Sequence, residues 1–284
     1  MLLSASYNYF NGDEHFLASL RAIRSEIDHI SVIWQEKSNA GEMITDRALQ
    51  ALDEAKHLQL VDTVIHFEPN LKCKRRINEL EKREIGLDSA RSAGATHFLS
   101  LDTDEFYREH EIAAAKIQIE QHSWKSTSVG TFMHLIRPIY RSKDTTCCCF
   151  ITQIESETRI GVPEFPCDNV DSTRRMTASA ETHHHFDSDL IAMYHMNLVR
   201  LDLQQKLRNS STVNKKFLRQ VERALSSWSP GLNFHFPEKG VFTVSEVPNE
   251  FDTYDPGSAE ASSKKSSWMD RLGLRPVSRK ARKD

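Results

Sequence analysis

The sequence predicts an α/β protein with a mostly parallel sheet flanked by helices, an added antiparallel hairpin and C-terminal helices. Over about the first hundred residues, short apolar runs alternate with helical patterns, which is typical of parallel strands joined by helices. From about residue 125 the pattern changes to a hairpin and then to two further helices. The 284 residues are 39% hydrophobic and 27% charged, a composition that supports a large core and excludes a disordered polymer.

Strands and helices alternate regularly up to residue 105. Apolar runs predict strands over 2–9, 30–34, 61–67 and 96–101, and the spacing of apolar residues predicts helices over 16–27, 43–57 and 74–92. In the third of these helices, Ile77, Leu80 and Leu87 are expected to face inward. Its many basic residues are expected to occupy the helix start and the outer face.

The second half of the sequence is less regular. Residues 131–140 are expected to pair with 145–154 across a turn at 141–144, and an irregular stretch rich in Pro, Asp, Thr, Arg and His follows over 155–189. Helices are expected over 201–209 and 213–226, and a late strand over 241–247. We therefore expect one folded region over 1–255 and a basic, disordered tail over 256–284.

The charge is unevenly distributed along the chain. Residues 261–284 hold eight basic and two acidic side chains, a net charge of +6, which leaves −9 for the first 260 residues. Such a tail suggests peripheral contact with an anionic membrane surface or, less favoured, with a nucleic acid, although a solvated terminus has the same composition. No apolar run approaches the roughly 20 residues of a membrane-spanning helix, and the first residues lack the features of a signal peptide. We expect a cytoplasmic protein, with the inner membrane face as its site of peripheral contact.

The cysteines and histidines do not follow a zinc-binding pattern. The five cysteines are odd in number and contain no C-x-x-C pair, so zinc-ribbon and disulfide frameworks are both disfavoured. Neighbouring side chains of Cys147, Cys148 and Cys149 point to opposite faces of an expected strand and are interpreted as small apolar residues in a reducing compartment. The triplet 183–185 of histidines is not expected to bind zinc, because adjacent residues do not easily offer convergent nitrogens.

A cluster of carboxylates follows the fourth expected strand. The apolar run ending at Leu101 leads directly into Asp102, Thr103, Asp104 and Glu105. In open α/β sheets, ligands bind outside the carboxyl ends of strands. Two carboxylates at such a position suit Mg²⁺ or Mn²⁺, which can neutralise a diphosphate. Acidic residues also cap strands and helices, so the pattern alone is a weak signal.

The order of several motifs resembles that of GT-A fold glycosyltransferases, which are Rossmann-like enzymes that take a sugar from a nucleotide diphosphate donor. The matching elements span roughly residues 1–250. They are the turn at 11–14, the helix segment 78–87, the D-x-D run at 102–104 and the segment 194–197. The resemblance implies a nucleotide-binding half over 1–105, an acceptor half over 106–255 and a metal-dependent hexosyltransferase active on a glycan or lipid-linked acceptor, as in polysaccharide synthesis.

The resemblance also implies roles for individual residues. Asp104 would bind the metal between the two phosphates, Asp102 would reach the ribose or the metal through water, and His195 would complete the metal shell. A neutral imidazole suits a mixed nitrogen and oxygen site for Mn²⁺, although a core histidine is the alternative. The remaining donor-binding candidates are cationic or lie at strand ends: Tyr7, Asn8, Trp34, Lys82, Arg83, Arg174 and Arg175.

Three questions remain open at the level of sequence. Gln35 and Glu36 follow the second strand where the family commonly has Asp, so uracil is one candidate among several bases. An inverting reaction needs a catalytic base, for which Asp187, Glu181 and Glu164 are candidates that spacing does not separate. The alternatives in function are a nucleotidyltransferase, which would show a Gly-rich basic first loop, and a non-catalytic protein that binds nucleic acid or membrane through its tail.

Overall fold

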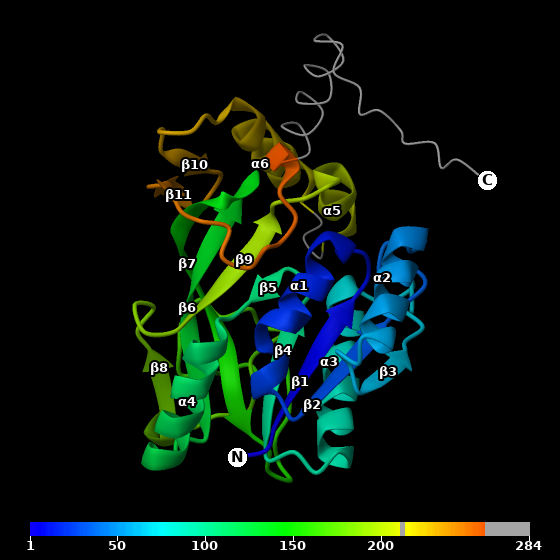
Figure 1. The fold of residues 1–284 in the computed structure, drawn as a ribbon, viewed down its shortest axis with the longest axis vertical. Coiled ribbons are helices and arrows are strands. Elements are labelled where there is room, and N and C mark those ends of the chain that lie inside the picture. Colours follow the sequence, from blue (N-terminus) through cyan, green and yellow to red (C-terminus); the bar gives the residue numbers. More distant parts are fainter. Residues whose placement is uncertain (211–213, 259–284) are drawn as a thin grey trace, which may run out of the picture.

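The computed structural model describes residues 1–210 and 214–258. Within them the predicted α/β class is confirmed, because a mostly parallel sheet forms the first half and helices flank it (Figure 1). Four parallel strands lie in the order β3-β2-β1-β4, namely β3 (Thr63–His66), β2 (His29–Trp34), β1 (Leu3–Tyr9) and β4 (His97–Asp102). The tail predicted over 256–284 lies outside the described residues from position 259 onward.

Helices cover both faces of this sheet. Odd-numbered residues of β1 pack in one core with α1 (Asp13–Ile23), α2 (Asp46–His57) and α4 (Glu109–His122). The opposite face is covered by α3 (Arg75–Ser92) and by the irregular segment after residue 154. A Cβ at Gly86 of α3 would lie 2.1 Å from Ser6 Oγ, so this helix approaches β1 as closely as only glycine allows. Helix α4, which follows the carboxylate cluster, was not predicted from the sequence.

The predicted hairpin exists, but it belongs to the main sheet and turns elsewhere. Strand β6 (Ser126–Leu135) pairs with β7 (Arg137–Gln153), and β7 pairs with β4. The expected turn at 141–144 is wrong, because the chain reverses at Ile136 and residues 141–143 pair within the ladder. Ile136 has φ +62°, which is uncommon for a β-branched residue, and its amide donates to the Leu198 carbonyl.

The sheet continues with β9 (Ala192–Leu198), which lies beside β6 and pairs with the short β5 (Glu105–Phe106). Strand β8 (His183–Phe186) pairs with the other end of β6, and β12 (Ser245–Glu246) pairs with β7. Because β6, β7 and β9 continue the sheet of β1–β4, the expected halves 1–105 and 106–255 share one sheet.

A small lobe lies at one end of the molecule (Figure 1). It contains α5 (Leu203–Asn209), α6 (Lys215–Ser227) and the two-stranded sheet of β10 (Phe234–Phe236) and β11 (Gly240–Phe242). Its apolar side chains pack on the ends of β6 and β9, in a core with Leu135 and Leu198. The helices match the expected segments 201–209 and 213–226 closely, whereas the strand expected over 241–247 is divided between β11 and β12.

Candidate functional site

The carboxylate cluster lies where the strand order of the sheet reverses. The chain runs from β1 outward to β2 and β3 and then returns to the other side of β1 with β4. Asn8 of β1 stands opposite Asp102 of β4 in the parallel register. Ligands of open α/β sheets bind at such a switch point, because the loops after the two strands diverge and leave a crevice.

The turn after β1 closes tightly over the turn after β4. Gly12 has φ +80°, and a Cβ there would lie 2.5 Å from Thr103 Oγ1. Glycine therefore satisfies both the left-handed backbone and the close contact. This contact fixes the start of α1 against the carboxylate cluster.

Asp104 is the most heavily paired carboxylate of the site. Its buried Oδ2 accepts hydrogen bonds from Arg200 and from Lys206 Nζ, the latter at 2.9 Å. His195 Nε2 lies 3.6 Å from the same oxygen. Burial opposes ionisation, but Arg200 and Lys206 outweigh it and hold the pKa of Asp104 well below its usual range. Asp104 therefore remains a carboxylate at physiological pH.

Asp102 and Glu105 share a second set of cations. Arg174 donates to Asp102 Oδ2 at 2.6 Å and to Glu105 Oε2 at 2.7 Å. Arg83 contacts both oxygens of Asp102, at 3.1 and 3.2 Å. Burial raises the pKa of both carboxyls; the two arginines outweigh it at Asp102, whose pKa is lowered, whereas at Glu105 burial prevails and the pKa stays raised.

Two hollows flank the cluster. The larger has a volume of about 720 Å³ and is lined by Asp102, His195 and Arg174 together with residues of β7 and of the irregular segment. The smaller, of about 70 Å³, lies between the turn after β1 and the start of α5, where Arg200 and Lys206 line it. The larger hollow has the volume of a ligand pocket, whereas the smaller one has room for only a few water molecules.

The predicted donor-binding residues are distributed unevenly around this site. Tyr7 is fully buried and its hydroxyl bonds to Ser19, so its ring lies in the core beneath the site. Asn8 lies at the strand end beside Asp102. Trp34 is half-buried at the end of β2, with its ring 4.8 Å from that of His66.

Two of the basic residues of α3 do not face outward as the pattern indicated, although Arg76 is exposed. Lys82 and Arg83 are buried, whereas Ile77, expected inside, is 42% exposed. The reason is that this face of α3 meets the polar end of β4, where Arg83 bonds to Ser100 and Asp102. Burial lowers the pKa of Lys82 to about 8, against the attraction of Glu79 and Asp102.

Of the two arginines predicted in the irregular segment, one lies in the site. Arg174 reaches the carboxylates, while Arg175 donates to the backbone carbonyls of Val170 and Pro163. The base candidates Asp187, Glu181 and Glu164 are exposed and line neither hollow. Acidic side chains that do line the larger hollow, besides the cluster itself, are Asp144, Asp171 and Glu238.

Sequence reasoning missed the two cations on Asp104. Arg200 and Lys206 lie 96 and 102 residues after it, and they approach because β9 runs beside β6 and leads into α5. The only local signal was their place after the segment that resembled the glycosyltransferases. Because neither residue is close to the D-x-D run in the sequence, their pairing with Asp104 could not be predicted from it.

The predicted metal ligands are Asp102, Asp104 and His195, and the positions of their ligand atoms show which of them could bind one divalent cation. Asp104 and His195 offer an oxygen and a nitrogen 3.6 Å apart, which suits two neighbouring ligands of one ion. Asp102 is turned toward Arg83 and Arg174. Among the residues that the structure describes, these three predicted ligands do not form a group with all ligand atoms within 4.8 Å of one another. Of the three predicted ligands, the structure therefore brings Asp104 and His195 together, while Asp102 is engaged by Arg83 and Arg174.

Comparison with known proteins finds similar structures only at low sequence identity and low TM-score. No protein-family model matches the chain, and no curated protein matches it. A structure of S. aureus TarS 1-349 shares 13% identity with a TM-score of 0.42, covering 80% of this chain and 76% of that one. The same protein in complex with UDP shares 15% identity with a TM-score of 0.35, covering 47% of this chain.

A mannose-1-phosphate geranyltransferase from Thermus thermophilus shares 10% identity with a TM-score of 0.29, covering 55% of this chain and 51% of that one. The present chain spans 36% of TarS 1-349 in the UDP complex, about a third of its length. All of these TM-scores are below 0.5, so function is inferred from the geometry of the site alone. No described helix is long and apolar enough to cross a membrane.

Proposed function

We propose that this protein is a glycosyltransferase that moves a sugar from a nucleoside diphosphate sugar to a hydroxyl of a glycan or lipid-linked acceptor. The observation that carries the proposal is the pairing of Asp104 with His195, Arg200 and Lys206 at the switch point of the sheet. An ionised carboxylate and an imidazole amid cationic side chains suit a divalent cation with a diphosphate. The larger hollow opens beside this group of side chains and, at about 720 Å³, has the volume of a ligand pocket.

The cationic side chains would do most of the electrostatic work. Negative charge develops on the departing nucleoside diphosphate as the bond to the sugar breaks, and fixed cations around it lower the barrier. Lys206 has 40% of its side chain exposed. Its ammonium could therefore turn from Asp104 to a phosphate oxygen of the donor with little rearrangement. Arg200 is buried and also contacts Glu14 at 3.4 Å, so it would hold its place beside Asp104.

The proposed cofactor is Mn²⁺ or Mg²⁺, held by Asp104 and His195. When bound, such an ion neutralises the diphosphate and strengthens it as a leaving group. Asp102, fixed by Arg83 and Arg174, would orient the donor ribose or a water near the ion. Asn8 and Trp34, at the ends of neighbouring strands, would then contact the nucleoside.

The larger hollow is the proposed space for both the donor diphosphate and the acceptor. Asp102, His195 and Arg174 line it, together with Asp144 and Asp171. The basic stretch over 261–284 would bring the enzyme to the anionic surface of a membrane that carries such acceptors.

The test is donor hydrolysis with Asp104→Asn. The full-length protein is incubated with a panel of nucleotide sugars, with Mn²⁺ or with chelator, and released nucleoside diphosphate is measured. We expect metal-dependent release from one donor and a loss on the order of a hundredfold or more in the variant, because Asn removes the charge but keeps the shape. Asp88→Asn is the matched control, since Asp88 is exposed on α3 and pairs with Arg91.

Two outcomes would contradict the proposal. Release that Asp104→Asn leaves unchanged would place the chemistry elsewhere. Pyrophosphate release from a nucleoside triphosphate and a sugar phosphate, without nucleoside diphosphate release, would instead establish a nucleotidyltransferase.

A further inference from the structure

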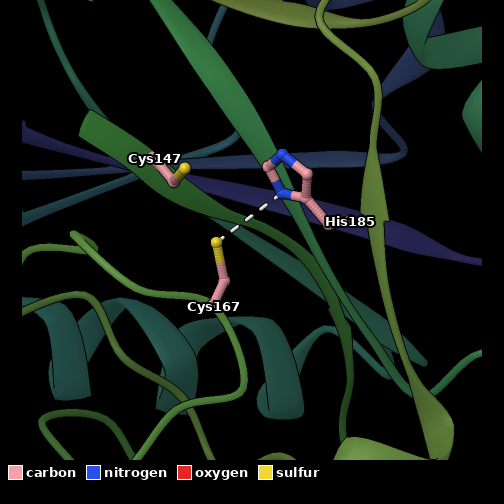
Figure 2. Close-up of side chains that lie close together, drawn as sticks. All are labelled: Cys147, Cys167 and His185. Carbon is pink, nitrogen blue, oxygen red and sulfur yellow. Dashed lines mark hydrogen bonds between the residues drawn. The ribbon is translucent and has the colours of Figure 1, made fainter. Parts of the chain in front are cut away.

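Two cysteines and a histidine meet on the side of the sheet where the irregular segment lies. Figure 2 shows Cys147 of β7, Cys167 of the irregular segment and His185 of β8 turned toward one another. Their ligand atoms all lie within 4.8 Å of one another, and Cys167 Sγ is 3.6 Å from His185 Nδ1. The cysteines are free thiols. None of the three belongs to the carboxylate cluster, although Cys147 also lines the larger hollow beside it.

The topology of the sheet brings these residues together. Strand β6 pairs with β7 on one side and with β8 on the other, so Cys147 and His185 project from strands flanking β6. The chain after Cys167 is fastened to β7 by a bridge between Cys147 and Val170 and by the Cys147 amide, which donates to Asn169 O. Cys148, the next residue of β7, has its sulfur near Arg174 instead.

We propose that Cys147, Cys167 and His185 form a binding site for Zn²⁺. Thiolate and imidazole ligands together select zinc over Mg²⁺ or Ca²⁺. In a tetrahedral zinc site, sulfur and nitrogen ligands lie about 3.5 Å apart, given zinc bonds of about 2.3 and 2.0 Å. The separation of 3.6 Å between Cys167 Sγ and His185 Nδ1 matches this value.

The surroundings of His185 are compatible with metal binding. Its Nδ1 also lies 2.8 Å from Ser128 Oγ, and that hydroxyl has a second partner in His183 Nε2 at 3.0 Å. Ser128 therefore keeps a hydrogen bond when Nδ1 binds a metal. His185 is exposed, so water can take the fourth position.

The site would fasten the irregular segment to the sheet. That segment has few regular elements between β7 and β8, yet it carries Arg174 to Asp102 and Glu105. Cys167 lies seven residues before Arg174. A metal bound to β7, β8 and Cys167 would hold this part of the chain at three points and so position Arg174 beside the carboxylates.

The experiment measures thiolate-to-metal binding directly and needs no sugar donor. Full-length protein is stripped of metal by chelator under reducing conditions and titrated with Co²⁺, whose bonds to thiolate give a characteristic absorption, and then with Zn²⁺ as competitor. We expect one equivalent of Co²⁺ with thiolate absorption, displaced by Zn²⁺, and loss of that absorption in Cys167→Ser and in His185→Ala. An ion at Asp104 gives no thiolate absorption, so the two sites are distinguished.

Cys73→Ser is the matched control, because Cys73 lies before α3 and outside the cluster. His185→Ala changes an exposed residue, so it tests the site without exposing the core. Limited proteolysis provides a second measurement: Zn²⁺ should slow cleavage within 155–182 in wild type and not in Cys167→Ser. The proposal is overturned if reduced wild type gives no thiolate absorption, if both ligand variants retain it, or if Zn²⁺ leaves cleavage unchanged.

Discussion

Arg174 and Asp102 stand 72 residues apart in the chain, and their side chains meet at 2.6 Å from Nη2 to Oδ2. The same guanidinium donates to Glu105, whose Oε2 in turn accepts from the backbone amide of Asp102 at 2.9 Å. One buried arginine therefore joins the irregular segment to the end of β4 and pairs with two carboxylates, of which Asp102 also pairs with Arg83.

Replacing Arg174 by Met should destabilise the fold. The change leaves Glu105 buried without its cation and Asp102 with Arg83 as a remaining partner. Breaking a buried ion pair from one side costs on the order of 3 kcal/mol, because an uncompensated charge remains inside. Urea unfolding at neutral pH measures the loss. Arg175→Met is the control, since Arg175 bonds to backbone carbonyls, and an equal loss in both variants would contradict the special role of Arg174.

Replacing Lys206 by Met should weaken donor binding with a smaller effect on the fold. Its ammonium lies 2.9 Å from Asp104 and its side chain is 40% exposed, so folding does not depend on its burial. A charge-assisted hydrogen bond to phosphate contributes about 1.5–3 kcal/mol, so KM for the donor should rise at least roughly tenfold. Steady-state kinetics at varied donor concentration would show this. Arg208→Met, which removes an exposed cation paired with Glu42, should leave KM within twofold.

The sequence predicted those parts of the site that are encoded locally. The acidic run after β4 was found because an apolar strand ended directly in Asp102, and strand ends are where ligands of such sheets bind. His195 was placed by resemblance, and the structure sets it 3.6 Å from Asp104. Its role as a metal ligand stays a prediction.

Contacts between residues far apart in the sequence, and unusual backbone conformations, could not be predicted in the same way. Arg200 and Lys206 are adjacent to Asp104 only because of the strand order. The turn at Ile136 carries no turn signal, since an apolar β-branched residue rarely adopts positive φ. Arg83 looked solvent-facing because basic residues crowd α3, and only the polar end of β4 makes its burial favourable.

The free energy of unfolding should fall as the pH drops from about 6.5 to 4, in part because of His15. Burial lowers its pKa to about 4, against a usual value of 6.5, while its ring bonds to Thr253 and to the Val199 carbonyl. A histidine with a lowered pKa in the folded state stabilises the fold above its unfolded pKa. That stability is lost as protons bind the unfolded chain first, by up to about 3 kcal/mol.

Urea unfolding of wild type and His15→Gln across pH 7 to 4 isolates this contribution. Gln can keep hydrogen bonds to the same partners but does not titrate, so its curve should be flatter between pH 6.5 and 4. Subtracting the two curves removes the contributions of other groups, such as Asp102, that both proteins share. Parallel curves would show that His15 does not contribute to the acid lability.

Gly86→Ala should loosen the helix that carries Arg83 to the site. The added Cβ would lie 2.1 Å from Ser6 Oγ and 2.6 Å from Ser6 Cβ, distances that force α3 away from β1. Overpacking of this kind typically costs about 1–3 kcal/mol, which urea unfolding would detect. Ser6→Gly removes both opposing atoms, so the double variant should recover part of the stability lost in Gly86→Ala. If the second substitution adds its own cost without recovery, the close contact between Gly86 and Ser6 is not what limits this position.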